Sequence, residues 1–104
     1  MKYRNGFFRI DIAKNKEQAI GYIISTINEK NVGEIESLFI HDQYRGAGIG
    51  ENLLDCALTL LDERKVQSKV VNVAYGNEDA FGFYAKHGFF PRATRLIQKE
   101  RDIQ

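Results

Sequence analysis

The feature that most limits the fold is a change of hydrophobic period on either side of a glycine-rich segment. Before that segment, apolar and β-branched residues indicate three strands, at about residues 6–12, 19–27 and 33–40. Polar turns of about four residues separate them, and turns of this length join antiparallel neighbours. After the segment, apolar residues recur every three or four positions, which predicts an amphipathic helix over about 49–64. We therefore expect an antiparallel meander followed by a helix.

The second half of the chain continues the alternation of strands and helices. Residues 69–75 are nearly continuously apolar, as is typical of a strand covered on both faces. Asn77 is predicted to cap a second helix, Gly88 to end it in a left-handed conformation, and residues 93–99 to form a last strand. The predicted order is βββ-α-β-α-β. The fold class is α/β (α+β), with a mixed central sheet in which the strands flanking the first helix run parallel.

Composition limits the class of protein. A chain of 104 residues is interpreted as one domain, residues 1–104, with homodimerisation left open because so small a core has little stability to spare. A net charge of +1 argues against a nucleic-acid partner. We expect no membrane partner, because no signal peptide or long apolar run is evident.

The cysteine and histidine residues carry little chemistry. The single cysteine, Cys56, is interpreted as a buried structural thiol in a reducing cytoplasm, since it has no internal disulfide partner. His41 and His87 do not stand at metal-ligand spacing, so no metal is expected.

The glycine-rich segment, residues 43–50 (QYRGAGIG), is where the sequence predicts chemistry. Glycine allows tight bends and close approach of a ligand, and unpaired N–H groups at the start of a helix attract anions. A diphosphate suits such a segment, although a plain tight turn would use the same residues. A P-loop is excluded by the sequence Gly50-Glu51-Asn52, and the glycine spacing does not match the dinucleotide-binding fingerprint.

Several motifs together resemble one family. Arg45-x-x-Gly48-x-Gly50 is similar to the Arg/Gln-x-x-Gly-x-Gly/Ala motif of the GNAT superfamily of acetyl-CoA-dependent N-acetyltransferases. Leu38-Phe39-Ile40 resembles the strand before that motif, and residues 77–89 resemble the family's N-x-x-A…F-Y-x-x-x-G-F segment. The likeness covers about residues 18–97. It implies a GNAT-like fold in which the N-terminal strand and the two helices that wall the acceptor site look absent.

The resemblance implies a binding mode for acetyl-CoA. Main-chain N–H groups would hold its pyrophosphate, from Arg45, Gly46, Ala47, Gly48, Ile49, Gly50 and Glu51. The strand segment Leu38, Phe39, Ile40 would hold the pantetheine like an extra strand, and one of its N–H groups would polarise the thioester carbonyl. Asn77 would contact the coenzyme, and Tyr84 would protonate the departing thiolate. Asn77 can cap the helix and contact the coenzyme at the same time. A cap without coenzyme contact, and simple packing of Tyr84, remain the alternative interpretations.

The general base is the least constrained role. An amine must lose a proton before it can attack, and a carboxylate usually takes that proton, often through water. Glu34 lies near the position of the catalytic glutamate of histone-type relatives, and Glu36 shares its strand face. In relatives that acetylate ribosomal-protein N-termini, the glutamate position corresponds to Asn72, which cannot act as a base.

Two functions therefore stay open. The first is a cytoplasmic N-acetyltransferase that transfers an acetyl group from acetyl-CoA to a primary amine of a small molecule, peptide or protein. The alternative is a non-catalytic acyl-CoA-binding regulatory module.

Overall fold

A computed structural model describes residues 6–100. They fall into two compact units, one ending at Asn72 and the other beginning at Val73. The single domain expected for the whole chain stays a prediction.

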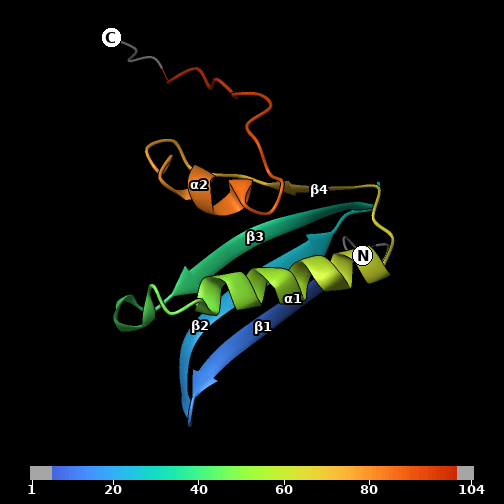
Figure 1. The fold of residues 1–104 in the computed structure, drawn as a ribbon. Helices are drawn as coiled ribbons and strands as arrows, with labels where there is room; N and C mark the ends of the chain where they lie inside the picture. The colour runs from blue at the N-terminus through green and yellow to red at the C-terminus, as the bar shows by residue number, and fades with distance from the viewer. Residues whose placement is uncertain (1–5, 101–104) are drawn as a thin grey trace. The chain divides into compact units, whose positions relative to one another are not determined.

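The first unit contains a four-stranded sheet in the order β1-β2-β3-β4 (Figure 1). Strands β1 (Phe7–Asn15), β2 (Gln18–Ile27) and β3 (Val32–Ile40) are antiparallel neighbours, whereas β4 (Ser68–Val71) runs parallel to β3. The predicted meander and the parallel return strand are confirmed. The first strand continues three residues beyond its predicted end at residue 12.

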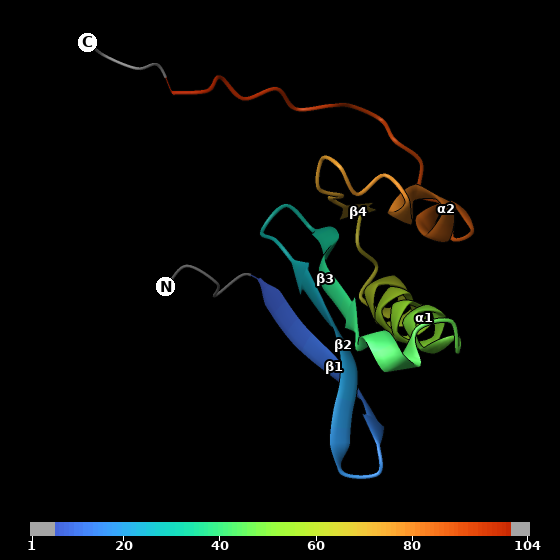
Figure 2. The same ribbon diagram turned by 90° about the vertical axis from the view of Figure 1, so that its left-hand side faces the viewer.

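One long helix covers one face of this sheet. The helix α1 (Ile49–Glu63) lies along β1–β3 in both views (Figures 1 and 2). Its buried residues are those of the predicted apolar stripe: Leu53, Leu54, Ala57, Leu60 and Leu61. They pack over buried sheet residues such as Ile23 and Ile35, and this burial is the main source of stability for the unit.

The second face of the sheet carries the alternate side chains. Phe8, Thr26 and Glu34 pair directly across β1, β2 and β3, so they lie on one face, opposite the side that α1 covers. Exposure there is high for large apolar residues of β1: Phe8 is 61% exposed, Ile10 47% and Ile12 55%. This second sheet face therefore combines apolar side chains with the carboxylates of β3.

The strand predicted over residues 69–75 is shorter than expected. The strand β4 pairs with β3 only from Val32↔Ser68 to Ile35↔Val71, and Val70 is 40% exposed, so full cover on both faces was a wrong prediction. A bulge explains the early end: the β2–β3 register shifts between Ile24 and Ser25, which leaves Glu36 as the extra residue of β3. Bulges bend the strand that carries them, and pairing with β4 stops one residue before this one.

The second unit contains the helix α2 (Ala80–Ala85). The prediction that Asn77 caps this helix is wrong, since Asp79 occupies the N-cap position. Instead the main-chain carbonyl of Asn77 accepts the N–H of Ala80 at 3.1 Å, in a turn that follows the left-handed Gly76. Gly88 has φ +88°, which confirms its predicted left-handed conformation after the helix.

The last predicted strand, residues 93–99, does not form, and these residues are exposed. Their apolar content suggested a strand. An extended segment becomes a strand only where a neighbour takes up its main-chain hydrogen bonds, and no neighbour pairs with this one among residues 6–100.

Candidate coenzyme and acyl-transfer site

The glycine-rich segment folds as a tight turn between β3 and α1. A short 3₁₀ turn, η1 (Asp42–Tyr44), follows β3, and Gly46 and Gly48 then adopt left-handed φ values of +84° and +83°. Gly48 is the N-cap of α1. A Cβ on either glycine would meet no atom within 4 Å, so backbone conformation rather than lack of room selects glycine in the protein alone. The same open space admits a ligand close to the main chain.

The N–H groups of this turn are available to an anion. No acceptor in the described part of the chain bonds the N–H groups of residues 46–50, and the first bond into α1 runs from the Asn52 N–H to the Gly48 carbonyl at 3.1 Å. Unpaired N–H groups at the positive end of a helix dipole form a phosphate-binding site. The geometry thus fits the predicted contact with a pyrophosphate for Gly46, Ala47, Gly48, Ile49 and Gly50. The Arg45 N–H, which was predicted to share in it, instead donates to the Asp42 carbonyl at 3.3 Å.

The Arg45 side chain stiffens this turn. Its Nε donates to the Ile40 carbonyl at 3.3 Å, and its Nη2 lies 3.2 Å from Asp42 Oδ1. Both charged side chains are well exposed, at 64% and 83%, so water screens the pair. Asp42 also offsets the positive charge, which leaves the main-chain N–H groups as the stronger anion donors.

The unpaired edge of β3 begins where β4 ends. After Ile35, β2 is the only strand that pairs with β3. On the other edge, from Glu36 to Ile40, the described residues use one main-chain group: the Ile40 carbonyl, which accepts from Arg45 Nε. An extended ligand can add to such an edge as a further strand does. Leu38, Phe39 and Ile40, which were predicted to hold pantetheine, lie within this edge.

Two carboxylates lie where this edge begins. Glu36 Oε2 accepts a hydrogen bond from Thr26 Oγ1 at 2.9 Å, and Glu34 Oε2 accepts one from Asn72 Nδ2 at 2.8 Å. No lysine, arginine or histidine within residues 6–100 forms an ion pair with either glutamate. Neutral donors therefore hold both carboxylates, and their negative charge stays available to a cationic amine. Thr26 was not predicted as a partner, because the contact depends on strand register.

Tyr84 and Asn77 belong to the second unit. Tyr84 is half-buried in α2, with its ring edge-on to Phe83 and Phe89 at centroid distances of 5.1 and 6.0 Å. Burial raises the pKa of Tyr84 above its ordinary value of 10.0, so the phenol keeps its proton at neutral pH. Asn77 is exposed in the turn before α2. The first unit thus brings together the glycine turn, the β3 edge and both glutamates, whereas the other two predicted residues lie in the second.

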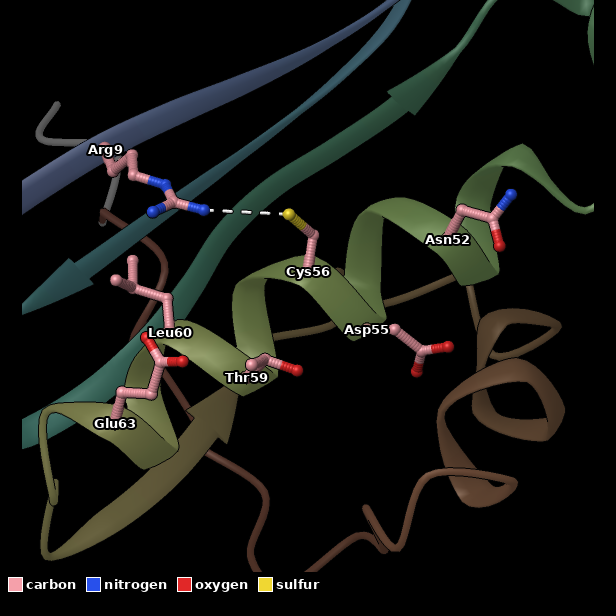
Figure 3. Close-up of a pocket in the computed structure, with 7 residues that line it drawn as sticks. All are labelled: Arg9, Asn52, Asp55, Cys56, Thr59, Leu60 and Glu63. Atoms are coloured by element: carbon pink, nitrogen blue, oxygen red, sulfur yellow. Dashed lines mark hydrogen bonds between the residues drawn. The ribbon is translucent and has the colours of Figure 1, made fainter.

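A hollow of about 390 Å³ beside α1 contains none of the predicted site residues. Its lining is Arg9, Asn52, Asp55, Cys56, Thr59, Leu60 and Glu63 (Figure 3). Cys56 is exposed, so the buried thiol was a wrong prediction. The residue lies next to the buried stripe of α1 rather than on it, and Arg9 Nη2 donates to its Sγ at 3.6 Å (Figure 3).

Two further features are not found between residues 6 and 100. No three His, Cys, Asp or Glu side chains come together there in a way that could hold a metal ion. No helix in this range is both long and apolar enough to cross a membrane.

Comparison with known proteins decides the family. The family model described as "Acetyltransferase (GNAT) family" matches residues 2–89, most of the chain. The chain belongs to the GNAT acetyltransferase family. An uncharacterized N-acetyltransferase of Archaeoglobus fulgidus is 34% identical over 80 residues, which are 71% of this chain and 54% of that protein. The peptidyl-lysine N-acetyltransferase YjaB of Salmonella typhimurium is 36% identical over 76 residues, 72% of this chain and 45% of that protein.

Solved structures show the same GNAT fold. The aminoglycoside N-acetyltransferase AAC(6')-Iy in complex with CoA superposes with a TM-score of 0.78 at 16% identity, covering 91% of this chain and 77% of that one. An acetyltransferase of Trypanosoma brucei gives 0.74 at 20% identity, covering 92% and 70%. The chain spans about half the length of the curated relatives it matches, between 39% and 54%.

The glycine turn and the β3 edge of this GNAT chain fit acetyl-CoA as co-substrate. The turn at Gly46 to Gly50 offers unpaired N–H groups to phosphates, and the β3 edge offers main-chain groups to an extended chain. These two features lie at opposite ends of the segment from Glu36 to Gly50. A ligand with phosphates at one end and an amide-bearing chain at the other matches that order.

Proposed function

We propose that this GNAT chain is an N-acetyltransferase that transfers an acetyl group from acetyl-CoA to a primary amine. The observation that carries the proposal is the presence, within one unit, of the unpaired N–H groups at the start of α1, the unpaired edge of β3, and two carboxylates where that edge begins. The first two features bind and orient a coenzyme, and the third accepts protons. A non-catalytic acyl-CoA-binding module would also need the N–H groups and the β3 edge, but it would not need a proton acceptor.

Each group has a defined task in this proposal. Acetyl-CoA supplies the acetyl group as a thioester. The N–H groups of residues 46–50 hold the phosphates, and the β3 edge aligns the pantetheine and donates one N–H to the thioester carbonyl. Loss of such a donor costs about 3–4 kcal/mol of transition-state stabilisation. Glu34 or Glu36 takes a proton from the ammonium, directly or through water, and the Tyr84 phenol gives a proton to the departing sulfur. Asn77 contributes a coenzyme contact.

The acceptor is proposed only as a primary amine. One relative is named for peptidyl lysine and a structural neighbour for aminoglycosides, so both amine types belong in the first panel. A cytoplasmic location, a single functional domain and a homodimer are parts of the same proposal, to be tested separately by fractionation, limited proteolysis and light scattering.

The test is time-dependent release of free CoA thiol with a panel of amines, run beside calorimetric titration of acetyl-CoA. Binding with turnover for at least one amine supports the enzyme. Binding without turnover for any amine supports the regulatory module, and the absence of binding removes both.

The carboxylates are tested by the double substitution Glu34→Gln with Glu36→Gln. We expect turnover to fall about 10²–10⁴-fold, the usual contribution of a general base, with unchanged coenzyme affinity. Glu29→Gln is the matched control, because Glu29 is an exposed glutamate in the β2–β3 turn of the same unit.

A further inference from the structure

We propose that Asn72 is a positioning residue that holds Glu34 as the proton acceptor, and that Glu36 does not have this role. The inference rests on the proposed acetyltransferase function and makes it more specific. It is carried by the hydrogen bond from Asn72 Nδ2 to Glu34 Oε2, which is 2.8 Å long and joins residues 38 positions apart in sequence.

The position of this bond in the sheet sets it apart. Ile35↔Val71 is the last pair between β3 and β4. Glu34 precedes this pair in β3, and Asn72 follows it directly after the end of β4. Their hydrogen bond therefore crosses between the two strands at the point where they separate. It holds the Glu34 carboxylate on the β4 side of β3, next to the point where β4 pairing ends and the β3 edge becomes available to a ligand.

Glu36 is drawn the other way. Its partner Thr26 belongs to β2, which lies on the side of β3 away from β4. Glu36 is also exposed, whereas Glu34 is only partly exposed. Of the two carboxylates, Glu34 is thus the one held on the side of β3 where its edge becomes unpaired.

The chemistry of an amide suits this task. The Asn72 amide donates a proton to Oε2 without bringing a positive charge, so it fixes the carboxylate without competing with the ammonium of an acceptor. Oε1 of Glu34 has no hydrogen-bond partner among residues 6–100, which leaves that oxygen for the acceptor nitrogen or a bridging water. A lysine in place of Asn72 would neutralise the glutamate, and an aspartate would repel it.

The test is a double-mutant cycle between Asn72→Leu and Glu34→Gln. Leucine has nearly the shape of asparagine and no donor. We expect N72L to lower kcat about tenfold with little change in KM for acetyl-CoA, and to cause no further loss in the E34Q background, because contacting residues that act as a unit are not additive. Thr26→Val is the matched control: it removes the donor to Glu36, and we expect less than about a twofold change.

The outcomes separate the inference from the function beneath it. Equal losses from N72L with and without E34Q, or an unchanged kcat, would overturn the role of Asn72 while leaving the enzyme in place. Full activity of E34Q together with loss of activity in Glu36→Gln would identify Glu36 as the general base, and this would also overturn the proposed role of Asn72. No turnover by the wild-type protein with any amine would end both proposals. Asn72→Ala replaces N72L if calorimetry shows that N72L does not fold.

Discussion

Replacing Gly48 by alanine tests whether the left-handed turn before α1 holds the coenzyme. The perturbation is a single methyl group on a residue with φ +83°. That methyl would meet no atom within 4 Å, so steric clash contributes nothing in the free protein. Only the backbone conformation resists the change, and this makes the magnitude simple to derive.

Two opposing terms set that magnitude. A left-handed conformation costs a residue with a Cβ about 1–2 kcal/mol. Alanine also restricts the unfolded chain more than glycine, which returns about 0.4–1 kcal/mol. The net cost is therefore about 1 kcal/mol. If the turn keeps its shape, the cost appears as lower stability, with a Tm drop of about 4–8 °C for a domain of this size. If the turn relaxes, its N–H groups move away and the cost appears as weaker binding of acetyl-CoA, about fivefold in Kd.

The assay follows directly: differential scanning calorimetry of the free protein, and isothermal titration with acetyl-CoA. The sum of the two losses should be near 1 kcal/mol however it divides. Gly82→Ala is the control, because Gly82 lies within α2, has no left-handed φ, and also has open space around its Cβ position. It should raise stability by about 0.5–1 kcal/mol. The reasoning is wrong if G48A changes neither Tm nor affinity, or if both variants shift Tm in the same direction.

Three further predictions concern groups of known burial. The wild-type protein should lose stability above about pH 10, because burial raises the pKa of Tyr84 in the folded state and the phenol of the unfolded chain ionises first. Tyr84→Phe should abolish this loss. If urea unfolding at pH 9 and pH 11 shows no difference between the two proteins, the prediction is wrong. Ser25→Ala should leave stability equal or higher by about 1 kcal/mol, since the buried hydroxyl has no partner in the described residues; a clear drop in the urea midpoint would contradict this. Gly21→Ala should cost about 1–3 kcal/mol, because its Cβ would lie 2.8 Å from the main-chain oxygen of Phe39; an unchanged midpoint would show that β3 yields easily.

The parts of the fold that local pattern determines were predictable. The change of period around the glycine segment located the meander and α1, because a strand alternates every two residues and a helix every three to four. The burial of one face of α1 then followed from the spacing of its apolar residues. The residues at which helices and strands begin and end were less predictable. Asn77 has the chemistry of a cap, but the left-handed Gly76 and the turn after it delay the helix until Ala80.

The failures on the C-terminal side share one cause. Residues 72–75 and 93–99 have strand-like composition, yet neither range forms a strand. Strand formation depends on a partner elsewhere in the chain, and single-residue preferences carry no information about that partner. The wrong prediction for Cys56 has a different cause. One helical step of about 100° separates it from the buried Ala57, which is enough to move its side chain out of the core.

The bulge at Glu36 connects these points to the site. Had β3 continued its alternation, Ile35, Ser37 and Phe39 would share one face. The extra residue instead places Ser37 opposite Ile24 and Leu38 opposite the buried Ile23, so the alternation is reset within the strand. The sequence GEIESLFI contains both patterns, and which one prevails depends on pairing with β2. The same irregularity lies where β3 and β4 part, which leaves an edge for a ligand and two carboxylates held toward opposite neighbours. A local departure from regular pairing, rather than any single motif, thus creates the features on which the proposed site depends.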